Sequence, residues 1–293
     1  MAHQTGVFEF TQRPPAPPIT AVCFDGGGVR GIAAALVMEA IMKKLEEESG
    51  GAEPELVHNR FDVLAGTSTG GLLAILLGQL HVPANDAFDL LRNASQSGRF
   101  QGLKTKVGNV FSSKHGDEDV RRVIEEHWNS SKKTMLYEES PRGLLVASDR
   151  STGIPEIVPF NVIPRVSFTS TVKHCQLKVT VLNVDGGIGR NNPTKLLIKE
   201  VRRKHHDKSV RFRLLLSIGS GLDANSAAIH EDVSNDFKAF DLGCYVRVDV
   251  PGIVGFGVND RKAIPKIKEA TSSFLSSEPG EKFLAVVVEV LRS

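Results

Sequence analysis

The sequence lacks most of the features that mark specialised protein classes. Among its 293 residues are only three cysteines, Cys23, Cys175 and Cys244, and they are widely spaced. This odd, scattered set predicts neither a disulfide framework nor a zinc site, and it fits a reducing compartment. No apolar run reaches the ~18 residues that a membrane span needs, and residues 1–18 have no apolar secretory core. We therefore expect a cytoplasmic protein whose contact with a membrane is peripheral.

An excess of one charge is also missing. The formal net charge is +2 at pH 7, so there is no electrostatic reason to expect a nucleic acid partner. Hydrophobic residues make up 41% of the chain, which is enough for a sizeable core. We predict a Pro-rich tail over residues 1–18 and a single domain over residues 19–293. No residue pattern predicts a metal or cofactor, and none predicts an oligomeric state.

Apolar runs alternate along the chain with amphipathic segments of helical period. Alternating strands and helices predict a three-layer α/β/α domain with a mostly parallel central sheet. Further helices are expected to begin near Asn85, Asp117 and Pro193. The expected strands are 19–24, 61–65, 143–147, 177–184 and 212–218, and the expected long helices are 32–45 and 281–291.

The segment Gly66-Thr-Ser-Thr-Gly70 lies between two apolar runs. Strand, G-x-S-x-G and buried helix are typical of a nucleophile elbow, which presents a serine hydroxyl at a helix N-terminus. Such a turn imposes strained dihedrals on the serine, and side chains at Gly66 and Gly70 would collide where strand and helix approach. The pattern indicates Ser68 as a nucleophile. The alternative is a turn without chemistry, because G-x-S-x-G is common.

A second glycine-rich segment, Asp25-Gly-Gly-Gly-Val-Arg-Gly31, follows the first expected strand. Its G-x-G-x-x-G spacing also fits a dinucleotide site, but the acidic residue that site requires falls at the end of a helix. Successive glycines at a helix N-terminus expose backbone N–H groups to negative charge. We therefore favour an oxyanion hole formed by Gly26, Gly27 and Gly28, over a plain strand-to-helix turn.

A serine nucleophile needs a proton acceptor. Asp185 ends an expected strand and precedes Gly186-Gly187, although Asp-Gly is also a common turn. Partial desolvation beside Ser68 would raise the pKa of its carboxyl from about 3.9 and make it a workable base. A Ser-His-Asp triad remains formally open, with His205, His206 or His230 as its histidine. The first two lie in a charge run that is typical of a solvated helix end.

Taken together, Asp25–Gly31, Gly66–Gly70 and Asp185–Gly187 resemble the motifs of the patatin-like phospholipase family, with all family motifs within residues 21–221. The resemblance implies a Ser68–Asp185 dyad without histidine, and an oxyanion hole at Gly26–Gly28. It assigns supporting motif positions to Asp25, Arg30, Gly31, Gly66, Gly70, Gly186 and Gly187. Arg30 is equally well explained as an ordinary surface arginine.

The resemblance implies a calcium-independent phospholipase A-type lipid acyl hydrolase. It would need no metal or cofactor and would take part in lipid degradation at a membrane or droplet surface. The interval 160–171 departs from the family, because the helix of small residues expected before the aspartate is not found there. A loosely held dyad loses rate, since a ~1 Å misplacement costs about 100-fold. The competing hypotheses are a catalytically impaired lipid-binding or regulatory relative and a Ser-His-Asp esterase.

Overall fold

A computed structural model describes residues 18–50, 55–96, 142–149, 155–159, 183–185, 191–205, 210–221 and 224–293. Five parallel strands lie in the order β3-β2-β1-β6-β7, and β4 and β5 each pair antiparallel with β3. All six residues of β1 are buried, as expected for a central strand that is covered on both faces. The strands are β1 (Ile19–Phe24), β2 (Val63–Thr67), β3 (Arg142–Asp149), β4 (Pro155–Pro159), β5 (Asn183–Asp185), β6 (Phe212–Ile218) and β7 (Gly243–Val248).

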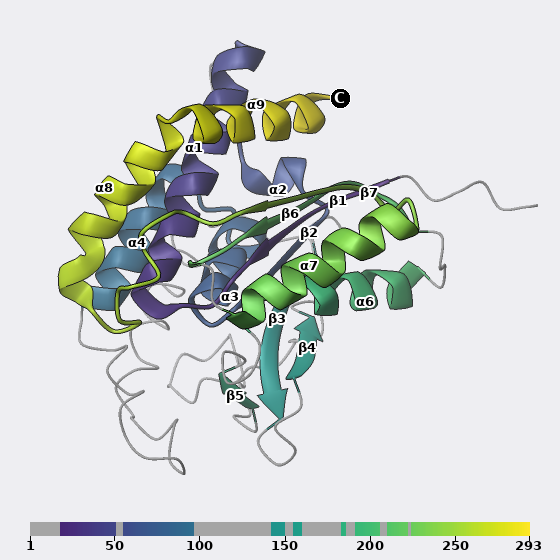
Figure 1. The fold of residues 1–293 in the computed structure, drawn as a ribbon, viewed down its shortest axis with the longest axis horizontal. Helices are drawn as coiled ribbons and strands as arrows, with labels where there is room; N and C mark the ends of the chain where they lie inside the picture. The colour runs from purple at the N-terminus through teal and green to yellow at the C-terminus, as the bar shows by residue number, and fades with distance from the viewer. Residues whose placement is uncertain are drawn as a thin grey trace, which may run out of the picture.

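Helices cover both faces of this sheet (Figure 1). One core packs the sheet against α1 (Ile32–Ser49), α2 (Val57–Arg60), α3 (Thr69–Ala74), α4 (Ala84–Gln96), α8 (Ile264–Leu275) and α9 (Glu278–Arg292). The other core packs it against α6 (Thr194–His205) and α7 (Ala224–Ala239). The prediction of a three-layer α/β fold with a mostly parallel sheet is therefore confirmed. None of the described helices is long and apolar enough to cross a membrane.

Most expected elements are present, with shifted ends. β1 and β6 have the predicted bounds, and Gly50 ends α1 in the left-handed conformation at φ 62°. The helices expected near Asn85 and Pro193 are present, and each begins one residue away from the named position. α4 begins at Ala84, before Asn85, and α6 begins at Thr194, where the Asn192 side chain accepts the Thr194 N–H. The helix expected at Asp117 lies outside the described residues, and the strand expected over 177–184 is described only as β5.

Candidate active site

Ser68 occupies the sharp turn between β2 and α3. Its dihedrals, φ 54° and ψ −121°, are rare for a residue with a side chain, and its carbonyl accepts the first α3 hydrogen bond, from Leu72 N–H at 3.0 Å. A Cβ on Gly66 would overlap the backbone of Gly70, and a Cβ on Gly70 would overlap the carbonyl of Phe24. The expected elbow geometry, including the close approach at both glycines, is confirmed. Ser68 is half-buried at the N-terminus of α3.

The glycine-rich loop lies beside this elbow, at the carboxyl end of β1. It continues as a 3-10 turn, Gly28–Gly31, into α1. The Gly26 N–H donates to the Asn191 carbonyl at 2.9 Å, so this amide is already engaged. Gly27 and Gly28 N–H donate to no acceptor among the described residues. Of the three amides predicted for an oxyanion hole, the latter two are therefore the candidates.

A segment from the C-terminal part of the chain packs onto this loop. The Val29 N–H donates to the Val258 carbonyl at 2.9 Å, and Arg30 Nη1 donates to the Val254 carbonyl at 3.2 Å. Gly28 has φ 58°, and a Cβ there would overlap the Val258 carbonyl. Arg30 is buried, so its interpretation as a surface arginine is wrong. The segment around Val254–Val258 therefore helps to hold the glycine-rich loop in place.

The backbone register brings Asp185 to the end of β2. Within β3, Val146 pairs with Thr67, the last residue of β2, and the next residue, Ala147, pairs with Asp185. Ala147 also pairs with Glu156 of β4, so β5 must lie on the same side of β3 as β2. One residue along a strand is about 3.3 Å. The backbone of Asp185 is thus aligned just beyond Thr67, where the chain turns at Ser68.

The chain after Asp185 then reaches the glycine-rich loop, since Asn191 accepts the Gly26 N–H. The three sequence motifs therefore meet at the carboxyl edge of the sheet. The carboxylate of Asp185, Gly186 and Gly187 lie outside the described part of the structure. No group of three or more potential metal ligands occurs among the residues that the structure does describe.

The one described candidate histidine side chain lies away from the elbow. His230 Nδ1 is 3.1 Å from the Tyr245 hydroxyl of β7. In the sheet, β1 and β6 separate β7 from β2, so this tyrosine's strand is about 14 Å from that of the elbow. Burial, followed by the nearby Arg247 charge, lowers the pKa of His230. The side chain of His205 and the whole of His206 lie outside the described residues.

Comparison with known protein families gives a match that contains both the glycine-rich loop and the elbow at Ser68. Residues 22–138 match the family model described as patatin-like phospholipase. Over this stretch the chain is similar to the patatin-like phospholipases. This match contains both the glycine-rich loop and Ser68, and it ends before Asp185.

Two curated relatives illustrate the extent of the similarity. Patatin-like protein 1 of Arabidopsis thaliana is 42% identical over 74 residues, which is 23% of this chain and 17% of the relative. Calcium-independent phospholipase A2-gamma of Mus musculus is 23% identical over 241 residues, or 69% of this chain and 28% of the relative. The chain thus spans less than a third of either relative's length. The crystal structure of VipD from Legionella pneumophila aligns at a TM-score of 0.33 and 11% identity, covering 88% of this chain and 68% of VipD.

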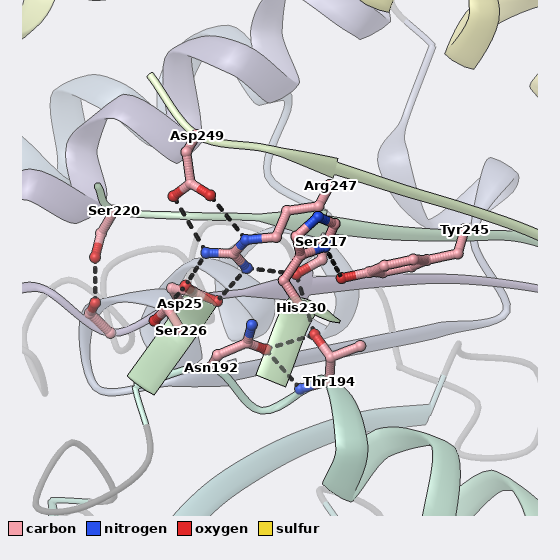
Figure 2. Close-up of polar contacts among 11 residues, drawn as sticks. Asp25, Asn192, Thr194, Ser217, Ser220, Ser226, His230, Tyr245, Arg247 and Asp249 are labelled. Atoms are coloured by element: carbon pink, nitrogen blue, oxygen red, sulfur yellow. Dashed lines mark hydrogen bonds and ion pairs between the residues drawn. The ribbon is translucent and has the colours of Figure 1, made fainter. Parts of the chain in front are cut away.

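Sequence reasoning missed the polar residues behind the glycine-rich loop. Asp25 was identified only as a motif position, but its carboxylate forms a buried ion pair with Arg247, which no motif indicated. The sequence feature that could have indicated this ion pair is Arg247 itself, which is the one charged residue in the run Cys244-Tyr-Val-Arg-Val248. Charged side chains are almost never fully buried unless they are paired. Figure 2 shows this arginine between two carboxylates.

Proposed function

We propose that this chain is a phospholipase A-type lipid acyl hydrolase in which Ser68 is the nucleophile and Asp185 the base. The observation that carries the proposal is the strained elbow at Ser68, which packs against the glycine-rich loop that contains the Gly27 and Gly28 amides. Backbone N–H groups at such a position stabilise the oxyanion of an acyl-transfer transition state. The β3 register of Thr67 and Asp185 supports the pairing of nucleophile and base.

In the proposed reaction, the Ser68 hydroxyl attacks the ester carbonyl carbon while its proton passes to the Asp185 carboxylate. The tetrahedral oxyanion accepts hydrogen bonds from Gly27 and Gly28. The carbon–oxygen bond to the leaving alcohol then breaks, and protonated Asp185 gives the alcohol its proton. Water then attacks the acyl-enzyme while Asp185 takes its proton. The bond between the acyl carbon and Ser68 Oγ breaks, Asp185 returns the proton to Ser68 Oγ, and the fatty acid is released.

The proposal also covers the class of substrate and the lipid surface at which the enzyme would bind it. Fatty-acyl esters of phospholipids and glycerolipids are the substrate class, in lipid degradation, and the name of the relative calcium-independent phospholipase A2-gamma supports activity without calcium. Such lipids lie in membranes or droplets, so the protein would act as a cytoplasmic enzyme bound peripherally. The exposed Val254, next to the glycine-rich loop, supports a contact with lipid on that side.

Covalent labelling with a fluorophosphonate probe tests the nucleophile. The intact protein should be labelled, and Ser68→Ala should lose all labelling, because the probe bonds only to an activated serine. Equal labelling of both proteins, or none of either, would contradict the enzyme hypothesis. A folded but unlabelled chain would instead be the impaired, lipid-binding relative.

Turnover of a phospholipid in EDTA tests the base. Asp185→Asn should lower kcat by about 10³- to 10⁴-fold, the scale of losing one member of a catalytic triad. His205→Ala and His206→Ala are the controls and should keep wild-type turnover. Loss of turnover in a folded histidine variant would favour a Ser-His-Asp triad, and loss of wild-type turnover in EDTA would contradict calcium independence.

A further inference from the structure

A buried ion-pair cluster lies behind the glycine-rich loop, at the carboxyl ends of β1, β6 and β7 (Figure 2). Arg247 belongs to β7, Asp25 follows β1 and Asp249 follows β7. The side chains of Arg247 and Asp25 are 2% and 1% exposed. Charges removed from water in this way are stable only with close partners and complete hydrogen bonding. The cluster therefore depends on its geometry.

All three nitrogen atoms of the Arg247 guanidinium group donate hydrogen bonds. Nη2 donates to Asp25 Oδ2 at 2.7 Å and to Asp249 Oδ1 at 3.1 Å, and Nε donates to Asp249 Oδ2 at 2.7 Å. Nη1 donates to Asp25 Oδ1 at 3.3 Å and to Ser217 Oγ at 2.8 Å. Two forked contacts to two carboxylates require the planar arginine, since a lysine is a point charge on a flexible stem.

The titration behaviour agrees with this arrangement. Burial alone would lower the pKa of Arg247, but the charge and hydrogen bonds of Asp25, and then Asp249, raise it above its ordinary value. Burial raises the pKa of Asp249, and Arg247 offsets part of that rise. The arginine is therefore charged at every ordinary pH.

The cluster is attached to the glycine-rich loop from two sides. Asp25 is the residue directly before Gly26, and its own N–H donates to the Ile218 carbonyl at 2.9 Å. After β6, the Ser220 hydroxyl donates to the Gly26 carbonyl, and Asp249 packs against the backbone of Gly219. Displacement of Arg247 would therefore be transmitted to the backbone that carries the Gly27 and Gly28 amides.

The same cluster reaches the segment that follows Asp185. Ser217 Oγ, which accepts from Arg247, lies 3.0 Å from Thr194 Oγ1, and Thr194 Oγ1 donates to Asn192 Oδ1 at 2.6 Å. Asn192 is the neighbour of Asn191, the acceptor of the Gly26 N–H. Arg247 is thus connected to both segments that border the glycine-rich loop.

We propose that Arg247, clamped between Asp25 and Asp249, is a positioning residue that orients the Gly27 and Gly28 amides toward the oxyanion. The inference rests on the proposed function, and it assigns a catalytic purpose to a part of the chain beyond the family match at residues 22–138. Arg247 is too deeply buried to touch a substrate. It acts through the loop, so its loss should affect the transition state more than substrate binding.

Arg247→Lys tests the proposal, because it keeps the charge and removes the fork. We expect kcat to fall by about 100-fold, the effect of a ~1 Å misplacement, with KM within about threefold of the wild-type value. Hydrogen exchange of the peptide covering residues 25–31 should become at least about tenfold faster by the same loosening. The control is Arg211→Lys, which alters the exposed Arg211–Asp241 pair at the other end of β6 and should change neither quantity.

A second variant covers the case in which Arg247→Lys does not fold. Asp249→Asn keeps the Arg247–Asp25 pair and the shape of the side chain, and it should lower kcat by about tenfold with KM unchanged. Unchanged kcat in a folded variant, or a fall in kcat without faster exchange at residues 25–31, would overturn the proposal. If the wild-type chain proves inactive, the proposed function fails, and the exchange of residues 25–31 still decides whether Arg247 holds the loop.

Discussion

At the scale of single residues, Ser68 and its two glycines were predictable from the sequence because each position has a local steric reason. Gly66 and Gly70 face backbone atoms that leave no room for a Cβ. The engaged amide of Gly26 was not predictable, because its acceptor, Asn191, is far away in the sequence. The motif shows which backbone N–H groups lie in the glycine-rich loop. Contacts with residues far away in the sequence decide which of these N–H groups already donate a hydrogen bond within the protein.

His58 carries a residue-scale prediction about pH. Its ring stacks on that of His81, with centroids 3.6 Å apart, and burial, followed by the His81 charge, lowers the pKa of His58 to about 4. The unfolded chain binds this proton near pH 6.5 and the folded chain only near pH 4. Stability is therefore greatest above pH 6.5 and falls as the pH drops toward 4.

Thermal unfolding checks this expectation. Wild-type Tm should fall between pH 7 and pH 5, and His58→Phe should show a clearly smaller fall, because the ring remains and the proton site is gone. His230, whose pKa is also lowered, should leave some pH dependence in the variant. Equal falls in Tm for both proteins would show that His58 is not the group responsible.

At the scale of elements, periodic apolar segments were predicted well, and less regular ones were missed. β1 and β6 are short apolar runs in the centre of the sheet, and their bounds agree with the prediction. β7 is an edge strand whose residues are mostly half-buried, and α7 buries only Ser226, Val233 and Phe237. Such elements are stabilised by their neighbours, so the sequence alone carries little signal for them.

The segment 251–258 carries the element-scale prediction. It joins β7 to α8, holds the glycine-rich loop through Val254 and Val258, and leaves Val254 50% exposed. If this segment meets lipid, Val254→Ser should weaken binding to phospholipid vesicles by about tenfold, the effect of losing one or two buried CH₂ equivalents. Hydrolysis of a short water-soluble ester should be unchanged.

Phe240→Ser is the matched control for vesicle sedimentation. Phe240 is 67% exposed, but it follows α7 near the amino end of β6, away from the glycine-rich loop. It should bind vesicles as the wild type does. Equal weakening in both variants would mean that exposed apolar surface in general, and not this segment, meets the lipid.

At the scale of the whole molecule, the three-layer architecture was predictable because buried strands alternate with amphipathic helices. The sequence predicts a single domain over residues 19–293 but no specific contact for its C-terminal helix. α9 packs on α1 and β6, and it buries Val287, Val288 and Leu291 in the core that contains the elbow helix. Its Arg292 also pairs with Glu48 of α1 at 2.7 Å. These contacts favour one cooperative unit that includes α1, β6 and α9.

Two neighbouring valines of α9 test that unit. Val287 is fully buried and Val286 is 39% exposed, so the same substitution by alanine can be compared at a buried and at an exposed position. Val287→Ala should lower the free energy of unfolding by about 2 kcal/mol through lost burial and a residual cavity. Val286→Ala should be neutral or stabilising by a few tenths of a kcal/mol, because alanine favours the helix.

Urea unfolding, followed by a spectroscopic probe of the sheet, measures this difference. A shifted unfolding midpoint for Val287→Ala alone indicates one cooperative unit. If α9 unfolded independently, that transition would be the same in both variants.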